Sequence, residues 1–150
     1  TVIADDPLLT CRSHDEQHNP IRIILDTDLK ISKNSQIVQT ADKIQTIIFT
    51  AQTSKYLHDN IEIITVKKAD TGLNLKDVIK HIANLGINNL LIEAGQKINT
   101  SFIKENLVDK IILFQSKKII GGDGLNAIGN LNLQNLNQCF EFRTEVISEN

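Results

Sequence analysis

Short apolar runs, rich in β-branched residues, recur along the whole chain and are separated by polar stretches. Runs of this length that are bounded by turn-forming residues are typical of β-strands. The pattern predicts strands over residues 1–4, 21–26, 44–51, 61–66, 88–95, 108–120 and 139–147. The last run alternates apolar and polar residues, which favours an antiparallel strand near the edge of a sheet.

Two other segments have the three-and-four spacing of apolar residues that marks an amphipathic helix. In the first, which we expect to end at Gly86, these residues are Leu75, Val78, Ile79 and Ile82. In the second, over residues 96–107, they are Ile98, Phe102, Ile103 and Leu107. Residues 30–43, 67–74 and 121–124 are expected to be loops, 54–60 a turn or short helix, and 125–136 irregular. Strands alternating with helices predict an α/β fold with a mostly parallel central sheet flanked by helices.

Composition places the chain among ordinary globular domains. Its 150 residues suit one domain, and 41% of them are apolar and 23% charged. The formal net charge of −2 provides no basic field for nucleic acid or an anionic membrane. No apolar stretch approaches the roughly 20 residues that a membrane-spanning helix needs. We therefore expect a cytoplasmic protein that binds neither nucleic acid nor membrane.

The two cysteines, Cys11 and Cys139, are far apart in the sequence and lie in no metal-binding spacing. We expect two separate thiols rather than a disulfide, and no metal site. The sequence contains no Met and opens within an apolar run. We take this as a sign that the chain is a piece of a longer protein.

Polar groups follow three of the predicted strands. In open α/β sheets, ligands bind beyond the carboxyl ends of the strands, so these groups are candidates for a site. They are Asp5-Asp6-Pro7 with Arg12, Asp26-Thr27-Asp28, and Glu93-Ala94-Gly95.

The third group, together with the start of the helix predicted after it, forms what we call the glycine elbow, residues 93–101. Backbone N–H groups at a helix start attract anions, and a glycine lets a ligand approach the backbone closely. The side chains of Asn99, Thr100 and Ser101 would add hydrogen bonds to a phosphate. The alternative is that Gly95 only makes a tight turn between strand and helix.

The other candidates also have structural alternatives. The guanidinium of Arg12 suits a phosphate, but a lone surface arginine is often only solvated. Asp5 and Asp6 are equally suited to capping or turn formation. His14, His18, His58 and His81 are scattered along the chain without a nucleophilic or metal-binding set. We expect His81, beside apolar neighbours in a helix, to be structural.

Three segments in this order resemble the reductase domain of bifunctional riboflavin biosynthesis proteins. They are TVIADDPLLTCR, NPIRIILDTDLKI and LLIEAGQKINTSFIKENLVDKIILFQSKKIIGGDG. The resemblance extends from residue 1 to about residue 125. It departs from the family where the usual proline before the final glycine loop is replaced by Ser116-Lys117-Lys118.

The resemblance implies a dihydrofolate-reductase-like fold and NADPH-dependent reduction of 5-amino-6-(5-phosphoribosylamino)uracil to the ribitylamino product. By the same resemblance, Leu8, Arg12 and Glu93 would contact the substrate, with Arg12 on its phosphate. The residues implied to bind NADPH are Thr1, Asp5, Thr27, Gly95, Gln96, Lys97, Ile98, Asn99, Thr100 and Ser101. The resemblance assigns no catalytic side chain.

The same resemblance implies a longer protein. The chain would be a reductase domain over residues 1–150 that lacks its first strand and helix, and a deaminase domain would precede it in the full-length protein. We expect such a fragment to be impaired, and we expect a homodimer. The alternatives are another NADPH-dependent reductase of pteridine or folate type with the same fold, or a non-catalytic dimerisation module.

Overall fold

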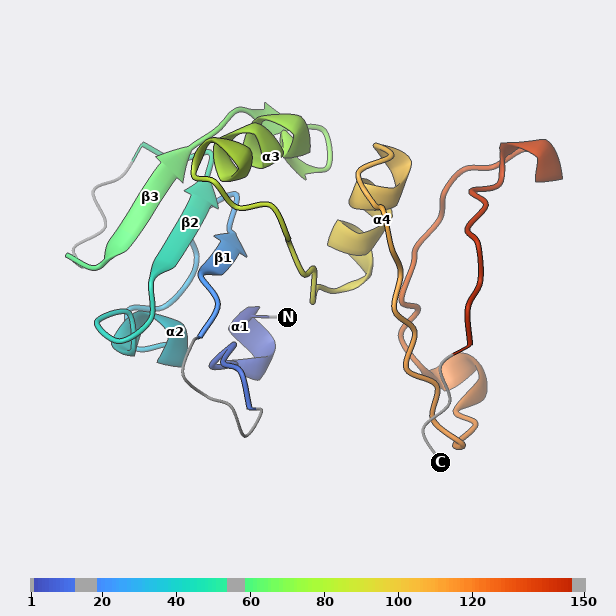
Figure 1. Ribbon diagram of the computed structural model, residues 1–150, viewed down its shortest axis with the longest axis horizontal. Coiled ribbons are helices and arrows are strands. Elements are labelled where there is room, and N and C mark those ends of the chain that lie inside the picture. Colours follow the sequence, from blue (N-terminus) through green and yellow to red (C-terminus); the bar gives the residue numbers. More distant parts are fainter. Residues whose placement is uncertain (1, 13–18, 54–58, 147–150) are drawn as a thin grey trace. The chain divides into compact units, whose positions relative to one another are not determined.

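The computed structural model describes residues 2–12, 19–53 and 59–146 (Figure 1). The chain divides into two units, Thr1–Leu90 and Leu91–Asn150. The first unit contains the sheet, and the second contains one longer helix and extended segments. Thr1, His14, His18 and His58 lie outside the described residues, as does most of the turn expected at residues 54–60.

The first unit is built on a three-stranded parallel sheet in the order β1-β2-β3. The strands are β1 (Arg22–Leu25), β2 (Thr46–Thr50) and β3 (Ile61–Thr65). Ile24 is in register with Ile48, and Ile48 with Ile63. Three predicted strands and the mainly parallel sheet are thereby confirmed.

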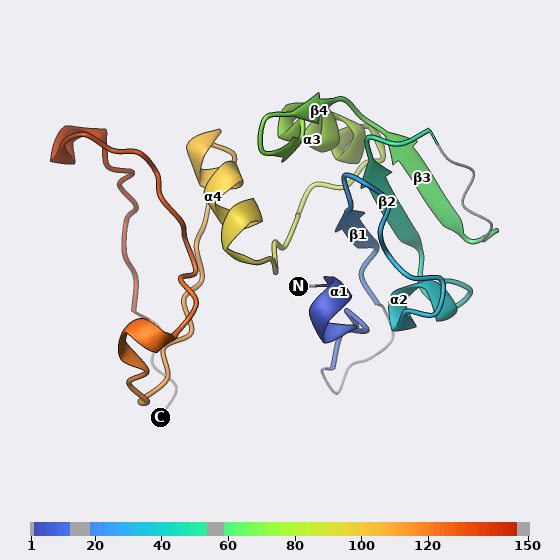
Figure 2. The same ribbon diagram turned by 180° about the vertical axis from the view of Figure 1, so that it is seen from behind.

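Helices cover both faces of this sheet, so the central strand β2 is buried along its whole length. On one face, Ile24 and Ile48 share a cluster with Ile37 and Val38, which belong to the short helix α2 (Gln36–Gln39). On the other face, Ile47 and Phe49 share a second cluster with Val78 and Ile82, which belong to α3 (Leu75–Asn84) (Figure 2). A parallel strand covered on both sides explains why its three central residues, Ile47–Phe49, are all apolar instead of alternating with polar residues.

The first predicted helix, α3, is confirmed together with its end. The Asn74 side chain caps its start by accepting a hydrogen bond of 3.1 Å from the Asp77 N–H. After the C-cap residue Leu85, Gly86 has a φ of 77°. This left-handed conformation is one that glycine adopts without steric cost, so the helix stops where the sequence predicts.

The second unit contains α4 (Gln96–Lys104), which confirms the other predicted helix. Thr100, Phe102 and Ile103 form its buried side. At its end, Asn106 has a φ of 54° and the Leu107 N–H bonds to the Phe102 carbonyl at 3.0 Å. Two single turns of 3-10 helix follow, η1 (Gly121–Asp123) and η2 (Leu136–Gln138).

The strand predicted at residues 1–4 is wrong, because Val2–Asp5 form a helical turn, α1. The Val2 carbonyl accepts a hydrogen bond of 3.0 Å from the Asp6 N–H, and the Val2 side chain packs against the first apolar cluster. A run of four residues is too short to separate a buried strand from a buried helical turn. Pro7 then prevents the turn from continuing.

Three further strand predictions are wrong within the described part of the chain: residues 88–95, 108–120 and 139–146 form no strand. Their side chains include Leu91, Phe114 and Ile119, which are 74%, 92% and 97% exposed. A β-branched run has strand propensity, but a strand forms only where a neighbour completes its hydrogen bonds. The expected antiparallel C-terminal edge strand is therefore absent from the described residues 139–146.

Three predicted loops contain small regular elements. The loop at residues 30–43 includes α2, and the loop at 67–74 includes an antiparallel pair, β4 (Lys68–Ala69) and β5 (Gly72–Leu73). The flexible loop expected at 121–124 contains η1.

Across the described residues, no helix is both long and apolar enough to cross a membrane.

Candidate functional site

The carboxyl ends of the three parallel strands meet at one edge of the first unit. Beyond β1, the Asp26 carboxylate accepts a hydrogen bond of 2.7 Å from the Ile31 N–H, so this side chain shapes a turn. The next residue, Thr27, receives the Ala51 N–H on its carbonyl at 3.1 Å. Its hydroxyl faces Gly72, where an added Cβ would lie 3.6 Å from Thr27 Oγ1. Thr27 is thus held at the sheet edge where the sequence predicts a ligand.

The last of these strand-end groups, Asp28, pairs with two lysines. The hydrogen bond from Lys30, with Nζ at 3.1 Å, and the positive charge of Lys30 are the main causes that lower the pKa of Asp28. Lys68, with Nζ at 3.8 Å, lowers it further. All three side chains are largely exposed, so the pair contributes little to stability.

We expect Lys30→Gln to raise the pKa of Asp28 toward its ordinary value of 3.8. Because folding lowers this pKa, the pair stabilises the fold above the unfolded-state pKa, and that small contribution is lost as the pH falls through the folded-state value. An NMR titration of the Asp28 carboxyl carbon measures the shift. Lys33→Gln is the matched control, and an equal shift in both variants would show that the specific pairing is irrelevant.

The N-terminal bend, residues 5–12, carries three predicted ligand-binding residues. Asp5 ends α1 with an exposed side chain, and Arg12 is also exposed. The Leu8 side chain is 39% exposed. Asp6 has the structural role considered for it, because its carboxylate Oδ1 accepts a hydrogen bond of 2.9 Å from the Gln36 N–H at the start of α2. Arg12 is therefore available to a ligand, while Asp6 is occupied.

Sequence reasoning missed Arg22, a cation that is only 2% exposed. Its guanidinium donates to the Thr46 hydroxyl at 2.8 Å and to the Thr40 hydroxyl, also at 2.8 Å. It also donates to three backbone carbonyls, those of Leu8, Ile37 and Ile44. Within the described residues no carboxylate pairs with it. Burial lowers the pKa of Arg22 from its ordinary value. The sequence feature that could have indicated this buried cation is a single charged residue inside the apolar run IRIIL.

The glycine elbow lies in the second unit. Glu93 is exposed, and Gly95 takes the N-cap position of α4 with φ −80° and ψ 171°. Glycine has no side chain to cap the helix, and the first N–H groups of any helix lack partners within it. The N–H groups of residues 96–98 are therefore suited to an anion, as the sequence predicts.

Three polar side chains of α4 bond to the protein itself. The Asn99 amide donates to the carbonyls of Ala94 and Ala127, each at 3.1 Å. The Thr100 hydroxyl donates to the Gln96 carbonyl at 2.6 Å and accepts from the Gly129 N–H at 2.7 Å. An added Cβ at Gly129 would lie only 3.1 Å from Thr100 Oγ1, so glycine permits this close approach.

The Ser101 hydroxyl donates to the Lys97 carbonyl at 3.1 Å, one turn earlier in the helix. Asn99 and Thr100 thus fasten the elbow to residues 127–129, and Ser101 bonds within α4. These bonds favour backbone N–H groups over the three side chains as the groups that meet a ligand.

Residues 1–148 match the family model described as the RibD C-terminal domain. The chain belongs to the RibD C-terminal domain family. The resemblance found in the sequence is thereby confirmed.

Individual relatives agree with this membership. The chain is 32% identical over 151 residues to a riboflavin biosynthesis protein RibD from Aquifex aeolicus (strain VF5), covering 98% of this chain and 40% of the relative. It is 26% identical over 133 residues to a 5-amino-6-(5-phosphoribosylamino)uracil reductase from Buchnera aphidicola subsp. Acyrthosiphon pisum. This match covers 81% of this chain and 64% of the relative. This RibD C-terminal domain thus spans less than half of the RibD relative.

A solved structure supports the fold. It is a diaminohydroxyphosphoribosylaminopyrimidine deaminase/5-amino-6-(5-phosphoribosylamino)uracil reductase from Thermotoga maritima. The TM-score is 0.75 at 24% identity, and the match covers 95% of this chain and 38% of that one. At this identity the likeness speaks for the fold alone.

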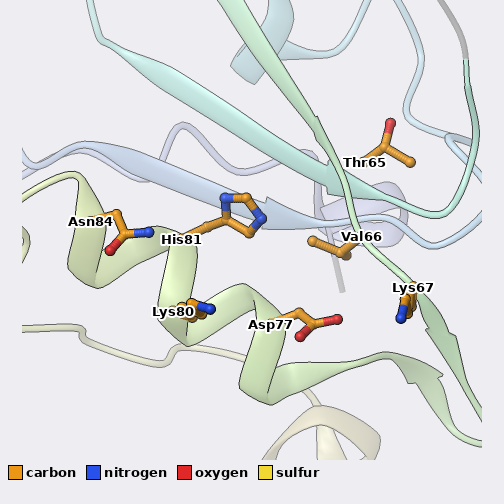
Figure 3. A pocket seen from close by; sticks show the side chains of 7 residues that line it. All are labelled: Thr65, Val66, Lys67, Asp77, Lys80, His81 and Asn84. Carbon is orange, nitrogen blue, oxygen red and sulfur yellow. The ribbon is translucent and has the colours of Figure 1, made fainter.

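A separate groove in this RibD C-terminal domain runs between the end of β3 and α3 (Figure 3). Its volume is about 370 Å³, and its lining residues are Thr65, Val66, Lys67, Asp77, Lys80, His81 and Asn84. The His81 ring lies 6.2 Å from the Phe49 ring, tilted by 55°. This contact with a core residue agrees with the structural role expected for His81. Among the described residues, none of those implied by the resemblance lines the groove.

The predicted site residues divide between the two units. Asp5, Leu8, Arg12 and Thr27 belong to the first, and residues 93–101 to the second. Each half has the local geometry described above. We predict that the two halves form one cleft, and this stays a prediction. The individual ligand contacts also stay predictions. Among the described residues, no group of three or more His, Cys, Asp and Glu side chains could hold a metal ion.

Proposed function

We propose that this chain is the reductase part of a riboflavin biosynthesis protein and reduces 5-amino-6-(5-phosphoribosylamino)uracil with NADPH. The observation that carries the proposal is the family match over residues 1–148. The relative whose name states this reductase activity, matched over 133 residues, gives the reaction. A dihydrofolate-reductase-like arrangement, with its parallel sheet, is the fold that we propose for the domain.

The glycine elbow is suited to hold the cofactor phosphates. The N–H groups of Gln96, Lys97 and Ile98 begin a helix whose dipole favours an anion, and Gly95 has no side chain to keep a ligand from the backbone. Thr27 lies at the sheet edge, and we assign it, with Asp5 and Thr1, further contacts to the cofactor. NADPH, when bound, supplies the hydride.

The remaining assigned residues bind the substrate. Arg12 is exposed and always charged, which suits the phosphate of the sugar chain. Glu93 is an exposed carboxylate that would accept hydrogen bonds from substrate hydroxyl or ring N–H groups. We place Leu8 beside the substrate. In the reaction, the first carbon of the opened sugar imine gains the hydride and the imine nitrogen gains a proton. The protein contributes orientation, which accounts for a large part of such rate enhancements.

The proposal extends to the longer protein. The chain would be a reductase domain without its first strand and helix, preceded by a deaminase domain in the same polypeptide and impaired as a fragment. We also propose a homodimer, which the exposed apolar side chains of Leu113 and Phe114 support. The cytoplasmic location expected from the sequence stays a prediction.

NADPH oxidation with the ribosylamino-pyrimidine phosphate as substrate tests the function, with the ribitylamino product identified by mass spectrometry. The chain and the full-length protein are assayed side by side. We expect turnover by the full-length protein and weaker turnover by the chain. Turnover of a pterin without turnover of the pyrimidine would replace this proposal with the pteridine reductase. Absence of any reductase activity and of NADPH binding in the full-length protein would favour the non-catalytic module.

A further inference from the structure

The N-terminal bend is fastened to a helix 30 residues further along the chain. The Asp6 carbonyl accepts a hydrogen bond of 2.6 Å from the Gln36 side chain, and Asp6 Oδ1 accepts one of 2.9 Å from the Gln36 N–H. Both acceptors thus belong to one residue and both donors to another. Asp6 has a φ of 40°, a left-handed conformation that aspartate adopts more readily than most residues other than glycine, and the two bonds help to hold it there.

This contact replaces the ordinary local cap of the helix. Ser35 occupies the N-cap position of α2, yet its side chain makes no capping hydrogen bond. Its hydroxyl is buried and has no partner among the described residues. The capping oxygen comes instead from Asp6, which couples the start of α2 to the bend.

Arg22 makes a second connection between the same two segments. Its Nη1 donates to the Leu8 carbonyl at 3.1 Å, and its Nη2 donates to the Ile37 carbonyl in α2 at 2.9 Å. The guanidinium is planar and rigid, so the positions of these two acceptors are linked. The bend is therefore held at Asp6 and again at Leu8, four residues before Arg12.

We propose that Asp6, Gln36 and Arg22 are positioning residues: together they hold the N-terminal bend so that Arg12 meets the substrate phosphate. The inference rests on the proposed function for the identity of the ligand. The hold on the bend itself is independent of that function. A displacement of about 1 Å in a binding group is enough to weaken binding at a site strongly. Loss of the two exposed hydrogen bonds between Asp6 and Gln36 would therefore affect substrate binding if it lets the bend move.

The exposed side chain of Gln36 allows a test that leaves the core intact. Gln36→Glu keeps the size of the side chain, removes its donor and puts a carboxylate beside that of Asp6. Gln39→Glu is the matched control, because Gln39 lies in the same helix, is exposed and donates instead to the Lys33 carbonyl at 2.8 Å. Both variants change the net charge equally.

Hydrogen exchange of the backbone amides in residues 6–12 measures how often the bend opens, and it needs no ligand. We expect exchange about five- to tenfold faster in Gln36→Glu and unchanged in Gln39→Glu, since loss of one hydrogen bond corresponds to roughly that factor. In steady-state kinetics of the full-length protein, we expect a similar rise in KM for the phosphorylated substrate, with kcat nearly unchanged. Adding Asp6→Asn to Gln36→Glu removes the like charges and should restore part of both losses.

The outcomes separate this inference from the proposed function. Unchanged exchange in Gln36→Glu would overturn the hold on the bend, whatever the reaction is. Faster exchange with an unchanged KM would overturn the role in substrate binding. If the wild-type protein has no reductase activity, the proposed function fails, while the exchange measurement still decides whether the bend is held.

Discussion

Replacing Arg22 with Met is expected to lower the free energy of unfolding by about 3 to 5 kcal/mol, because several buried acceptors lose their donor at once. The side chain is 2% exposed and donates to the hydroxyls of Thr40 and Thr46 and to three carbonyls. Methionine fills a similar volume but donates nothing. Each acceptor left buried and unpaired costs on the order of 1 to 3 kcal/mol, reduced where water enters. Urea denaturation followed by circular dichroism measures the change.

Two further variants control this prediction. Arg143→Met makes the same substitution at an exposed position and should change stability by less than about 0.5 kcal/mol. Arg22→Lys keeps the charge but offers three donors in place of five, so it should recover only part of the loss. If Arg22→Met were as stable as the wild type, the view that this cation joins the bend, α2 and β2 would be wrong.

The parts of the fold that the sequence predicted are those in which local pattern and tertiary burial agree. Residues 47–49 are three consecutive apolar residues because helices cover both faces of β2. The helix that ends at Gly86 has its apolar stripe, its cap and its stop within one segment. In both cases the sequence pattern that predicts the element lies within about a dozen neighbouring residues.

The wrong predictions concern interactions that a local pattern does not contain. Residues 108–120 have strand propensity, but no neighbouring strand pairs with them in the described structure. Arg22 was missed because its partners lie 14 to 24 residues away along the chain. In the candidate site, the start of α4 after Gly95 was predictable from the local sequence, although the strand expected before it does not form. The bonds of Asn99 and Thr100 to residues 127–129 were not, since they join segments almost 30 residues apart.

Removing the Arg12 side chain is expected to have the largest effect on the proposed reaction. We expect Arg12→Ala to raise KM for the phosphorylated substrate about 100-fold, which corresponds to about 2.7 kcal/mol for a charge-assisted contact with a phosphate. The fold should be unaffected because the Arg12 side chain is exposed. Steady-state kinetics of the full-length protein, with thermal unfolding measured in parallel, provide both values.

The substrate itself supplies the decisive control. With the dephosphorylated substrate, Arg12→Ala and the wild type should have similar KM values, because the group that Arg12 contacts is gone from both. Arg143→Ala should leave KM unchanged with either substrate, since Arg143 has no assigned role. An equal loss for both substrates would show that Arg12 acts on the shape of the bend instead of the phosphate. Such a result would place Arg12 with Asp6 and Gln36, among the residues that position the bend, and would leave the phosphate to another cation.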